Sequence, residues 1–238
     1  RSSDLAFLRP LFYGYPRGLR FELSEGGSFI EQFLTAHQKA TTVCSDVFDD
    51  DAPLTVCLRF RSALNACAHR SMLPQLDAAG IRIPRTRELW AERIPDDECL
   101  GEAVTEWWLY LAFEASRDLL PGLLWCAFAQ DFSVIQPRPA CMVYLFNLNA
   151  GIMVFPYDDR GMDVVGPNHA LLAALYHKYQ HALLDYDRGF FPSARAGFLQ
   201  AWVTQPDTVA LAALGQGGLL GYGVLRPCRT GYKIGPLF

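Results

Sequence analysis

The stretch Tyr157-Asp158-Asp159-Arg160-Gly161-Met162-Asp163-Val164-Val165, called the acidic turn below, places three carboxylates and one guanidinium between apolar runs. Before it, apolar residues alternate on both sides of Asn149-Ala150-Gly151: Met142, Tyr144 and Phe146 on one side, Ile152 and Val154 on the other. Alternation around a short turn is typical of a β-hairpin. After the acidic turn, apolar residues recur at helical spacing. The acidic turn therefore belongs to a strand meander that leads into a long amphipathic helix.

Two N-terminal segments show the periods of strand and helix. Leu19-Arg20-Phe21-Glu22-Leu23 alternates apolar and charged residues, as a half-buried strand does. Ser28 and Glu31 have the spacing of a capping box, and the apolar residues that follow at helical intervals predict a helix that ends at about Phe48. Residues 54–60 predict the next strand.

Three further segments predict one helix and two more strands. Residues 71–80 indicate a short helix, and residues 88–94 predict a third strand with Trp90 on its buried side. In residues 105–113 both alternating sets are apolar, which predicts a central strand that is buried on both faces.

The remaining helices of this region show apolar stripes. One stripe comprises Leu120, Leu123, Leu124, Ala127 and Phe128. A second helix begins after Asn168, a favourable N-cap residue, and has an inward face of Leu172, Leu175, Tyr176, Tyr179 and Leu183. Neither a repeat nor a linker interrupts the pattern, so residues 1–190 predict one α+β domain with a mostly antiparallel sheet and packed helices.

The tail has a simpler pattern. Residues 191–202 predict a helix, and three strands at 209–214, 219–225 and 232–238 are separated by short Gly-containing turns. Residues 191–238 therefore predict a C-terminal helix followed by a three-stranded antiparallel meander.

Composition narrows the classes of partner. The formal net charge is −4, the pI is near 5.7 and no run of Lys or Arg occurs, so we expect no nucleic acid. The apolar windows are shorter than the roughly 20 residues of a spanning helix, so we expect no membrane segment. The seven cysteines show no CxxC spacing and lie in apolar patterns, which is typical of the reducing cytoplasm. The chain begins at Arg1, so a leader could have been lost.

Several stretches, taken in order, resemble a bacterial family known as domain of unknown function 3885, over about residues 5–190. This resemblance gives a family name and implies no activity. The stretches are Arg9-Pro10-Leu11-Phe12-Tyr13, Gly18-Leu19-Arg20-Phe21-Glu22-Leu23, Leu123-Leu124-Trp125, Tyr157-Asp158-Asp159-Arg160-Gly161-Met162-Asp163, and Leu175-Tyr176 through Leu184-Asp185-Tyr186-Asp187-Arg188.

The tail resembles the middle of an acetyltransferase of the GNAT superfamily. The resemblance lies in Phe191 to Trp202, Gly221 to Cys228 and Gly231 to Phe238. It implies that the last strand lies beside acetyl-CoA, with Ile234 and Gly235 as cofactor-binding residues. A GNAT enzyme also needs a loop after that strand whose backbone N–H groups hold the pyrophosphate, and the sequence ends at Phe238. We therefore expect the acetyltransferase-like segment to be partial.

The acidic turn is the best candidate site. Asp158, Asp159, Arg160 and Asp163 are candidates for contact with a ligand or partner, as are three charged residues at the predicted end of the helix, namely Asp185, Asp187 and Arg188. The alternative is structural: the aspartates hold a turn through their own side-chain bonds, and Arg160 pairs with Asp185 or Asp187.

We expect no metal site. Asp49-Asp50-Asp51 lacks the ligand spacing of a calcium loop, and His177 and His181 have no third ligand and face away from the apolar stripe. No cofactor is predicted unless the tail binds acetyl-CoA.

Three functions remain open from the sequence. The first is a cytoplasmic binding or regulatory module that contacts a protein partner. The second is an acetyl-CoA-dependent N-acetyltransferase whose remaining half lies outside this sequence. The third is a hydrolase or other enzyme built on the acidic turn. Residues 232–238, as the outer strand of an incomplete sheet, also predict self-association.

Overall fold

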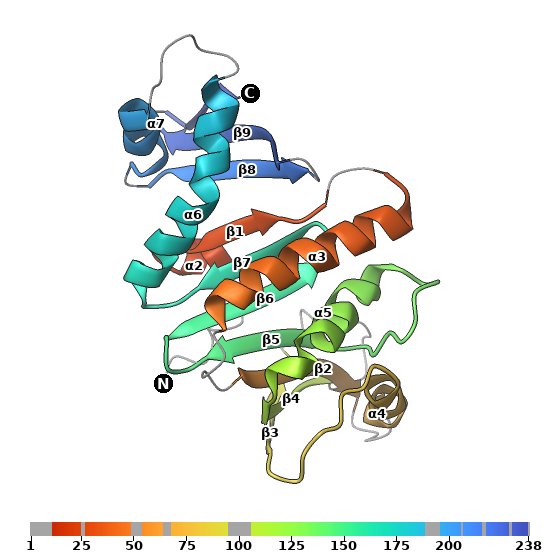
Figure 1. Ribbon diagram of the computed structural model, residues 1–238. Coiled ribbons are helices and arrows are strands. Elements are labelled where there is room, and N and C mark those ends of the chain that lie inside the picture. The colour runs from red at the N-terminus through yellow and green to blue at the C-terminus, as the bar shows by residue number, and fades with distance from the viewer. Residues whose placement is uncertain are drawn as a thin grey trace.

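The structure is a computed structural model that describes residues 11–24, 27–48, 54–63, 68–94, 106–188, 196–205, 207–215, 218–228 and 230–237. A seven-stranded sheet forms its larger part, in the order β1-β7-β6-β5-β2-β4-β3 (Figure 1). Every neighbouring pair is antiparallel, which confirms the predicted sheet. The strands are β1 Leu19–Glu22, β2 Leu54–Ala63, β3 Glu88–Arg93, β4 Glu106–Ala115, β5 Met142–Asn147, β6 Ile152–Asp158 and β7 Gly161–Val165.

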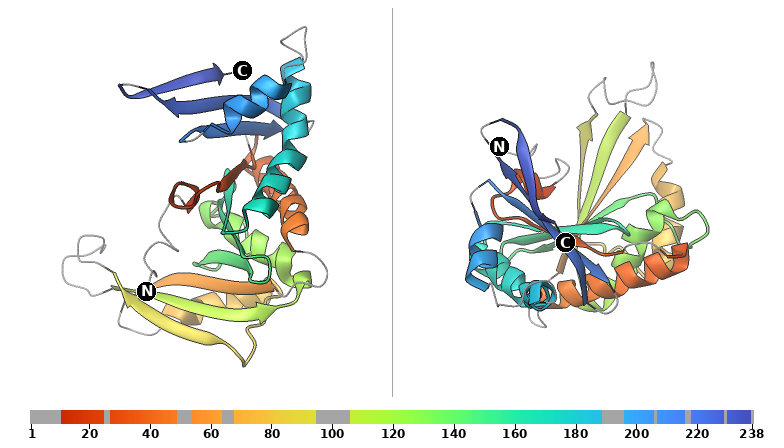
Figure 2. Two further views of the ribbon diagram at one scale, coloured as in Figure 1. Left: turned by 90° about the vertical axis from the view of Figure 1, so that its left-hand side faces the viewer. Right: turned by 90° about the horizontal axis from the view of Figure 1, so that it is seen from above.

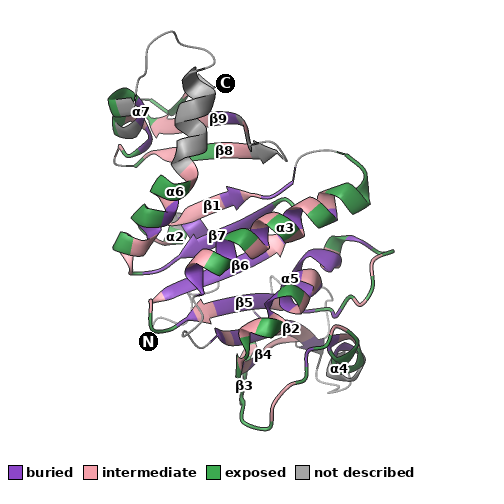
Figure 3. Ribbon diagram, viewed as in Figure 1, coloured by how far each residue is buried: buried purple, intermediate pink, exposed green. Residues whose placement is uncertain are grey.

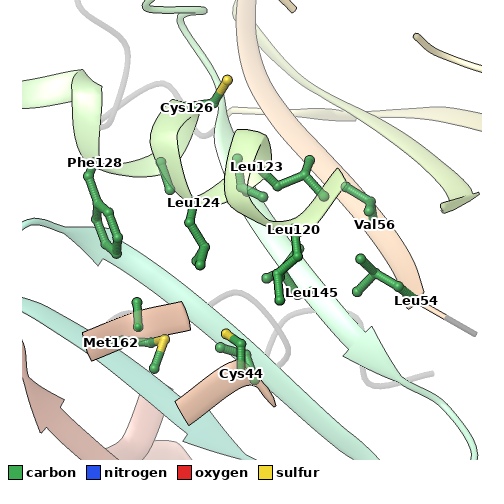
Figure 4. Packing of buried hydrophobic residues seen from close by; sticks show 14 of the residues in the cluster. Cys44, Leu54, Val56, Leu120, Leu123, Leu124, Cys126, Phe128, Leu145 and Met162 are labelled. Atoms are coloured by element: carbon green, nitrogen blue, oxygen red, sulfur yellow. The ribbon is translucent and has the colours of Figure 1, made fainter. Parts of the chain in front are cut away.

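Helices α3 (Phe29–Val47) and α5 (Leu120–Phe128) lie against one face of this sheet (Figure 1). The predicted capping box begins α3, because the Ser28 hydroxyl accepts from the Glu31 N–H and the Glu31 carboxylate accepts from the Ser28 N–H at 2.8 Å. Leu124 and Phe128 point from α5 toward the sheet and are fully buried (Figure 4). Complete burial of such a side chain contributes about 1.5–3 kcal/mol, so this interface carries much of the stability.

The other described helices are short or lie at the ends of the fold. Helix α4 (Ala68–Ala78) packs on the same core as α3 and α5, whereas α2 (Leu11–Gly14) packs on the opposite face of the sheet. Two single-turn 3₁₀ helices, η2 (Arg117–Leu119) and η3 (Ala129–Asp131), flank α5. Among the described helices, none combines the length and the apolar character that crossing a bilayer requires.

Two expectations about the sheet are wrong. Strand β4 is not central: it lies between β2 and the edge strand β3, and its first four residues are only half-buried. Trp90 on β3 is 38% exposed instead of buried, because nothing among the described residues covers the outer side of this edge. Strand β7 is buried along its whole length, and the next two strands in the order, β6 and β5, are buried along most of theirs (Figure 3).

A second sheet follows in the order β10-β9-β8, and it has the predicted meander (β8 Val209–Gly215, β9 Gly218–Pro227, β10 Tyr232–Leu237). Helix α7 (Ala196–Val203) packs on it, and a small core forms from Leu199, Val203, Tyr222 and Val224.

The long helix α6 (His169–Arg188) connects the two sheets and runs alongside both (Figure 2). Asn168 caps it as predicted, because its side-chain oxygen accepts from the Leu171 N–H at 3.1 Å. Leu172 and Leu175 are buried in the core of the large sheet, whereas Tyr176 packs against the small core. Strand β8 lies beside β1, although the described residues form no ladder between them. One helix therefore supports both cores.

Candidate functional site

The acidic turn is the hairpin that joins β6 to β7. Asp158, 7% exposed, pairs across the hairpin with Gly161. One of its carboxylate oxygens accepts from the backbone N–H groups of Arg160 at 2.9 Å and Gly161 at 3.1 Å. The other accepts from Arg160 Nε at 3.0 Å and from Arg160 Nη2. Asp158 thus closes the turn with its own side chain, and Arg160 completes the closure.

Asp159 ties the turn to the segment that follows β1. The Ser24 hydroxyl lies 2.8 Å from the Asp159 backbone oxygen and 3.2 Å from its carboxylate oxygen Oδ2. The Leu23 N–H donates to the Arg160 carbonyl at 2.8 Å. Burial raises the pKa of Asp159, and the nearby Asp158 charge raises it further, whereas the Ser24 bond opposes this shift.

Asp163 lies on the next strand, β7, and is 1% exposed. It stands opposite Arg20 in the β1–β7 ladder, and Arg20 Nε donates to its Oδ1 at 2.9 Å while Arg20 Nη2 donates to its Oδ2 at 3.3 Å. The Phe12 N–H also donates to Oδ2, at 3.4 Å. The Arg20 guanidinium lies over the Phe12 ring at 4.1 Å and the Tyr157 ring at 5.0 Å. The buried charge is therefore both paired and hydrogen-bonded.

Gly161 leaves room for Tyr157. A Cβ atom at this position would lie 1.9 Å from the Tyr157 hydroxyl oxygen, so the tyrosine ring lies over the glycine. Burial raises the pKa of Tyr157 to about 12, with the Arg20 charge acting in the opposite direction.

The structure favours the structural interpretation of these residues. The carboxylates of Asp158, Asp159 and Asp163 all accept hydrogen bonds from within the fold, whereas an enzyme built on the turn requires carboxylates that converge on an open cleft. We therefore do not propose the third candidate, a hydrolase. Of the four candidate side chains in the turn, Arg160 is the exposed one, at 75%.

Arg160 pairs with a local partner, Asp158, and the alternative pairing with Asp185 or Asp187 lies outside the described side chains. A local pair needs no second element to be correctly placed, and sequence spacing gave no reason to prefer the distant one. The side chains of Asp185, Asp187 and Arg188 lie outside the described residues, so their role as contact residues stays a prediction.

The structure describes only part of the two candidate metal sites. Residues 49–51 and the His181 side chain lie outside the described part of the chain. Within the described part, no group of three or more His, Cys, Asp or Glu side chains is placed to hold a metal ion.

The two candidate cofactor-binding residues, Ile234 and Gly235, lie on the edge strand β10. Ile234 is 62% exposed, and a bulge interrupts the pairing with β9 between Ile234 and Leu237. The Gly235 carbonyl accepts from Trp202 Nε1 on α7 at 2.6 Å. The Arg226 guanidinium lies over the Trp202 ring at 4.7 Å. The tryptophan thus fixes the bulged part of β10 to the helix.

Sequence reasoning missed Arg20, Ser24 and Trp202. Arg20 had one usable signal, since a charge in an alternating strand beside apolar residues requires a partner when that strand is covered. Ser24 and Trp202 gave no signal, because each contacts a residue from a distant part of the chain.

Two family models match the chain. The model of the family described as Domain of unknown function (DUF3885) matches residues 2–187, and that of the Acetyltransferase (GNAT) domain matches residues 183–238. Neither the curated proteins nor the solved structures give a match. The tail is thus similar to part of a GNAT domain, and the match over residues 2–187 covers most of the sequence. The chain therefore belongs to the family described as Domain of unknown function (DUF3885).

Proposed function

We propose that this chain is a protein-binding module that contacts its partner through the open edge of β10 in the acetyltransferase-like unit. The observation that supports the proposal is the direction of the backbone groups. The Cys228 N–H donates to the Gly231 carbonyl at 2.9 Å, and strand backbones alternate, so Tyr232 and Ile234 direct their N–H and C=O groups away from β9. Their side chains are 74% and 62% exposed. Such an edge is a template for strand addition.

The opposite edge of the small sheet is less open. Strand β8 lies beside β1, and Val209 packs against the core residues on that face of the large sheet. An incoming strand therefore meets β10 and not β8.

The acidic turn supports this contact surface indirectly. Asp163 pairs with Arg20 on β1, Asp159 bonds to Ser24 just after β1, and Asp158 closes the β6–β7 turn, so together they stabilise the platform on which α6 and the small sheet rest.

The compartment that we propose is the cytoplasm. Five cysteines within the described residues are free thiols, and four of them are buried (Cys44, Cys57, Cys126 and Cys141). Burial raises the pKa of Cys44 to about 12, which keeps this thiol protonated and unreactive. Free buried thiols suit a reducing compartment.

A second copy of the chain is the partner that tests the proposal most simply. Two β10 edges related by a two-fold axis form one antiparallel pair and close as a dimer. In sedimentation velocity across a concentration series, we expect the unaltered chain to shift from monomer to dimer. Ile234→Pro removes an outward N–H without disturbing the ladder to β9, so we expect it to remain monomeric.

Two further variants serve as controls. Ile234→Val keeps the N–H, and Arg160→Ala alters the acidic turn without touching β10, so we expect both to dimerise like the unaltered chain. A monomer at the highest concentration, or a dimer that Ile234→Pro leaves unchanged, would contradict the proposal.

A second candidate function is acetyl-CoA-dependent N-acetyl transfer. The match to the Acetyltransferase (GNAT) domain over residues 183–238 favours it, together with the position of Ile234 and Gly235 on the last strand of the meander. In this function the pyrophosphate-binding loop follows β10 and belongs to the remaining half of the domain.

Isothermal titration of the chain with acetyl-CoA tests this candidate. If β10 already forms part of the cofactor site, acetyl-CoA binds, and Gly235→Val weakens binding by placing a branched side chain on the strand. Ile234→Val is the matched control and retains binding. Absence of heat with acetyl-CoA, or equal binding by Gly235→Val, would remove this assignment from Ile234 and Gly235.

A further inference from the structure

A ladder of rings and guanidinium groups crosses one end of the large sheet. The Arg59 guanidinium on β2 lies 4.0 Å from the centre of the Trp108 ring and 5.5 Å from that of Tyr110, both on β4. The Arg61 guanidinium lies 5.3 Å from Trp108. Tyr110 in turn stacks on Trp90 of β3, with ring centres 4.9 Å apart and an angle of 2° between the planes. Arginines of β2 thus lie on the rings of β4, and one of these rings stacks on Trp90 of β3.

This ladder lies on the face of the sheet opposite α3 and α5. Tyr110 belongs to the core cluster of that opposite face, against which Trp108 packs, whereas Leu109 and Leu111 pack with the helices. Seen from above in Figure 2, the long helices gather on one side of the strands. Trp90 ends the ladder: its inner ring face meets Tyr110, and the side chain is 38% exposed.

Two carboxylates flank the last ring. Glu88 and Glu92 lie two residues before and after Trp90, so all three side chains share one face of β3. Glu88 is exposed, and Glu92 accepts from the Tyr110 hydroxyl at 2.7 Å. Arg93 lies on the other face by the same alternation. The inner cations are already balanced in part, since Arg61 Nε lies 3.4 Å from Glu106. The surroundings of Trp90 therefore favour an added positive charge.

The backbone at this edge is directed outward at two positions. The Ile94 N–H donates to the Glu106 carbonyl at 2.9 Å, so residues of the same parity as Ile94 direct their backbone groups to β4. Leu89 and Ala91 have the opposite parity, so their N–H and C=O groups point away from the sheet. Leu89 is 65% exposed and Ala91 is exposed, and β3 is the last strand in the sheet order.

We infer that the β3 edge binds an extended segment of a partner protein, in which lysine or arginine alternates with apolar residues. The segment adds as a strand, and its backbone bonds to Leu89 and Ala91. Its basic side chains lie over Trp90 between Glu88 and Glu92, where one more cation continues the ladder. Its apolar side chains cover Leu89 on the other face. This surface is separate from the β10 edge, so the two proposals stand or fall separately.

Binding is tested with two synthetic peptides, one that alternates lysine and valine and one that alternates glutamate and valine. Fluorescence anisotropy with the 238-residue chain should show binding of the lysine peptide and much weaker binding of the glutamate peptide. Hydrogen exchange should show new protection at the amides of Leu89 and Ala91. The amides of Trp90 and Glu92 are already bonded to β4, so their protection should change little.

Three variants separate the parts of the interaction. Ala91→Pro removes an outward N–H and should abolish binding, whereas the matched control Ala91→Ser keeps it. Trp90→Leu should lower the affinity for the lysine peptide roughly two- to five-fold, because an exposed cation–π contact is lost. Glu88→Gln combined with Glu92→Gln should bring the affinities of the two peptides together.

The inference would be overturned by equal binding of both peptides to the unaltered chain, or by no binding of either. It would also be overturned by full binding to Ala91→Pro, or by protection that appears on β10 instead of β3. Circular dichroism of each variant shows that it is folded. If Ala91→Pro is not folded, Trp90→Leu and the double Gln variant decide the result.

Discussion

Arg20 and Asp163 stand opposite each other on β1 and β7, and the guanidinium donates to both carboxylate oxygens, at 2.9 and 3.3 Å. The side chain of Asp163 is 1% exposed and that of Arg20 is 21% exposed. They are 143 residues apart in the sequence, so this pair fixes the N-terminal strand to the meander that contains the acidic turn. The pair has a structural role, so its loss should lower the free energy of unfolding.

Asp163→Ala should lower the free energy of unfolding by about 2–4 kcal/mol, because it leaves a partly buried guanidinium and the Phe12 N–H without their acceptor. The matched control is Arg160→Ala, which removes a largely exposed cation and should cost less than about 1 kcal/mol. Urea unfolding measures both. Equal losses of unfolding free energy for the two variants would show that Asp163 stabilises the fold no more than Arg160 does.

Asp159 predicts a pH dependence of stability. Its pKa is raised in the folded chain, so the folded state binds the proton more tightly than the unfolded state does. The ionised carboxylate therefore destabilises the fold at neutral pH, and this destabilisation is lost as the pH falls through the raised pKa. Asp159→Asn should be more stable than the unaltered chain at neutral pH, with an advantage that shrinks in acid. Thermal midpoints across a pH series test this.

Ser24→Ala is the control for the same site, because the Ser24 hydroxyl bond opposes the pKa rise. Its loss should raise the pKa of Asp159 further and lower stability at neutral pH. An Asp159→Asn variant with an unchanged pH profile would contradict the assignment.

Gly161 and Tyr157 should show energetic coupling. Gly161→Ala places a Cβ where the Tyr157 hydroxyl lies, so we expect a loss of about 1–3 kcal/mol from overpacking. When Tyr157→Ala is introduced as well, the clash disappears, and the double variant should lose less than the sum of the two single losses. Urea unfolding of the four proteins of this cycle gives the coupling energy. Additive losses would place the tyrosine ring away from Gly161.

Replacing either of two tyrosines on α6 by phenylalanine should change the free energy of unfolding differently. The Tyr179 hydroxyl donates to Asp46 at 2.8 Å, whereas the buried Tyr176 hydroxyl has no hydrogen-bond partner among the described residues. Tyr179→Phe should therefore cost about 1–2 kcal/mol, and Tyr176→Phe should be neutral or stabilising. Chemical unfolding of both variants tests this. A loss of stability in Tyr176→Phe would reveal a partner for its hydroxyl.

Local features of the fold were predictable from sequence. The capping box at Ser28 and the hairpin between β5 and β6 depend on residues a few positions apart, and both formed as expected. The α+β class and the C-terminal meander followed from the same periodicities.

Features that depend on strand order were not predictable. The apolar character of β4 suggested a central strand. Apolar residues on both faces of a strand, however, do not determine which strands pair with it. Arg20, Ser24 and Trp202 make their contacts across 143, 135 and 33 residues, and spacing says nothing about such pairs. We propose that the boundary between the two units lies near residue 190, with α6 serving both.

The account depends most on the open edge of β10, and hydrogen exchange of this strand at low and high protein concentration tests it directly. The outward amides of Tyr232 and Ile234 should exchange rapidly in dilute solution and become protected as the concentration rises, while the inward Lys233 amide stays protected throughout. Outward amides that exchange rapidly at every concentration, or that are protected even in dilute solution, would contradict the proposal.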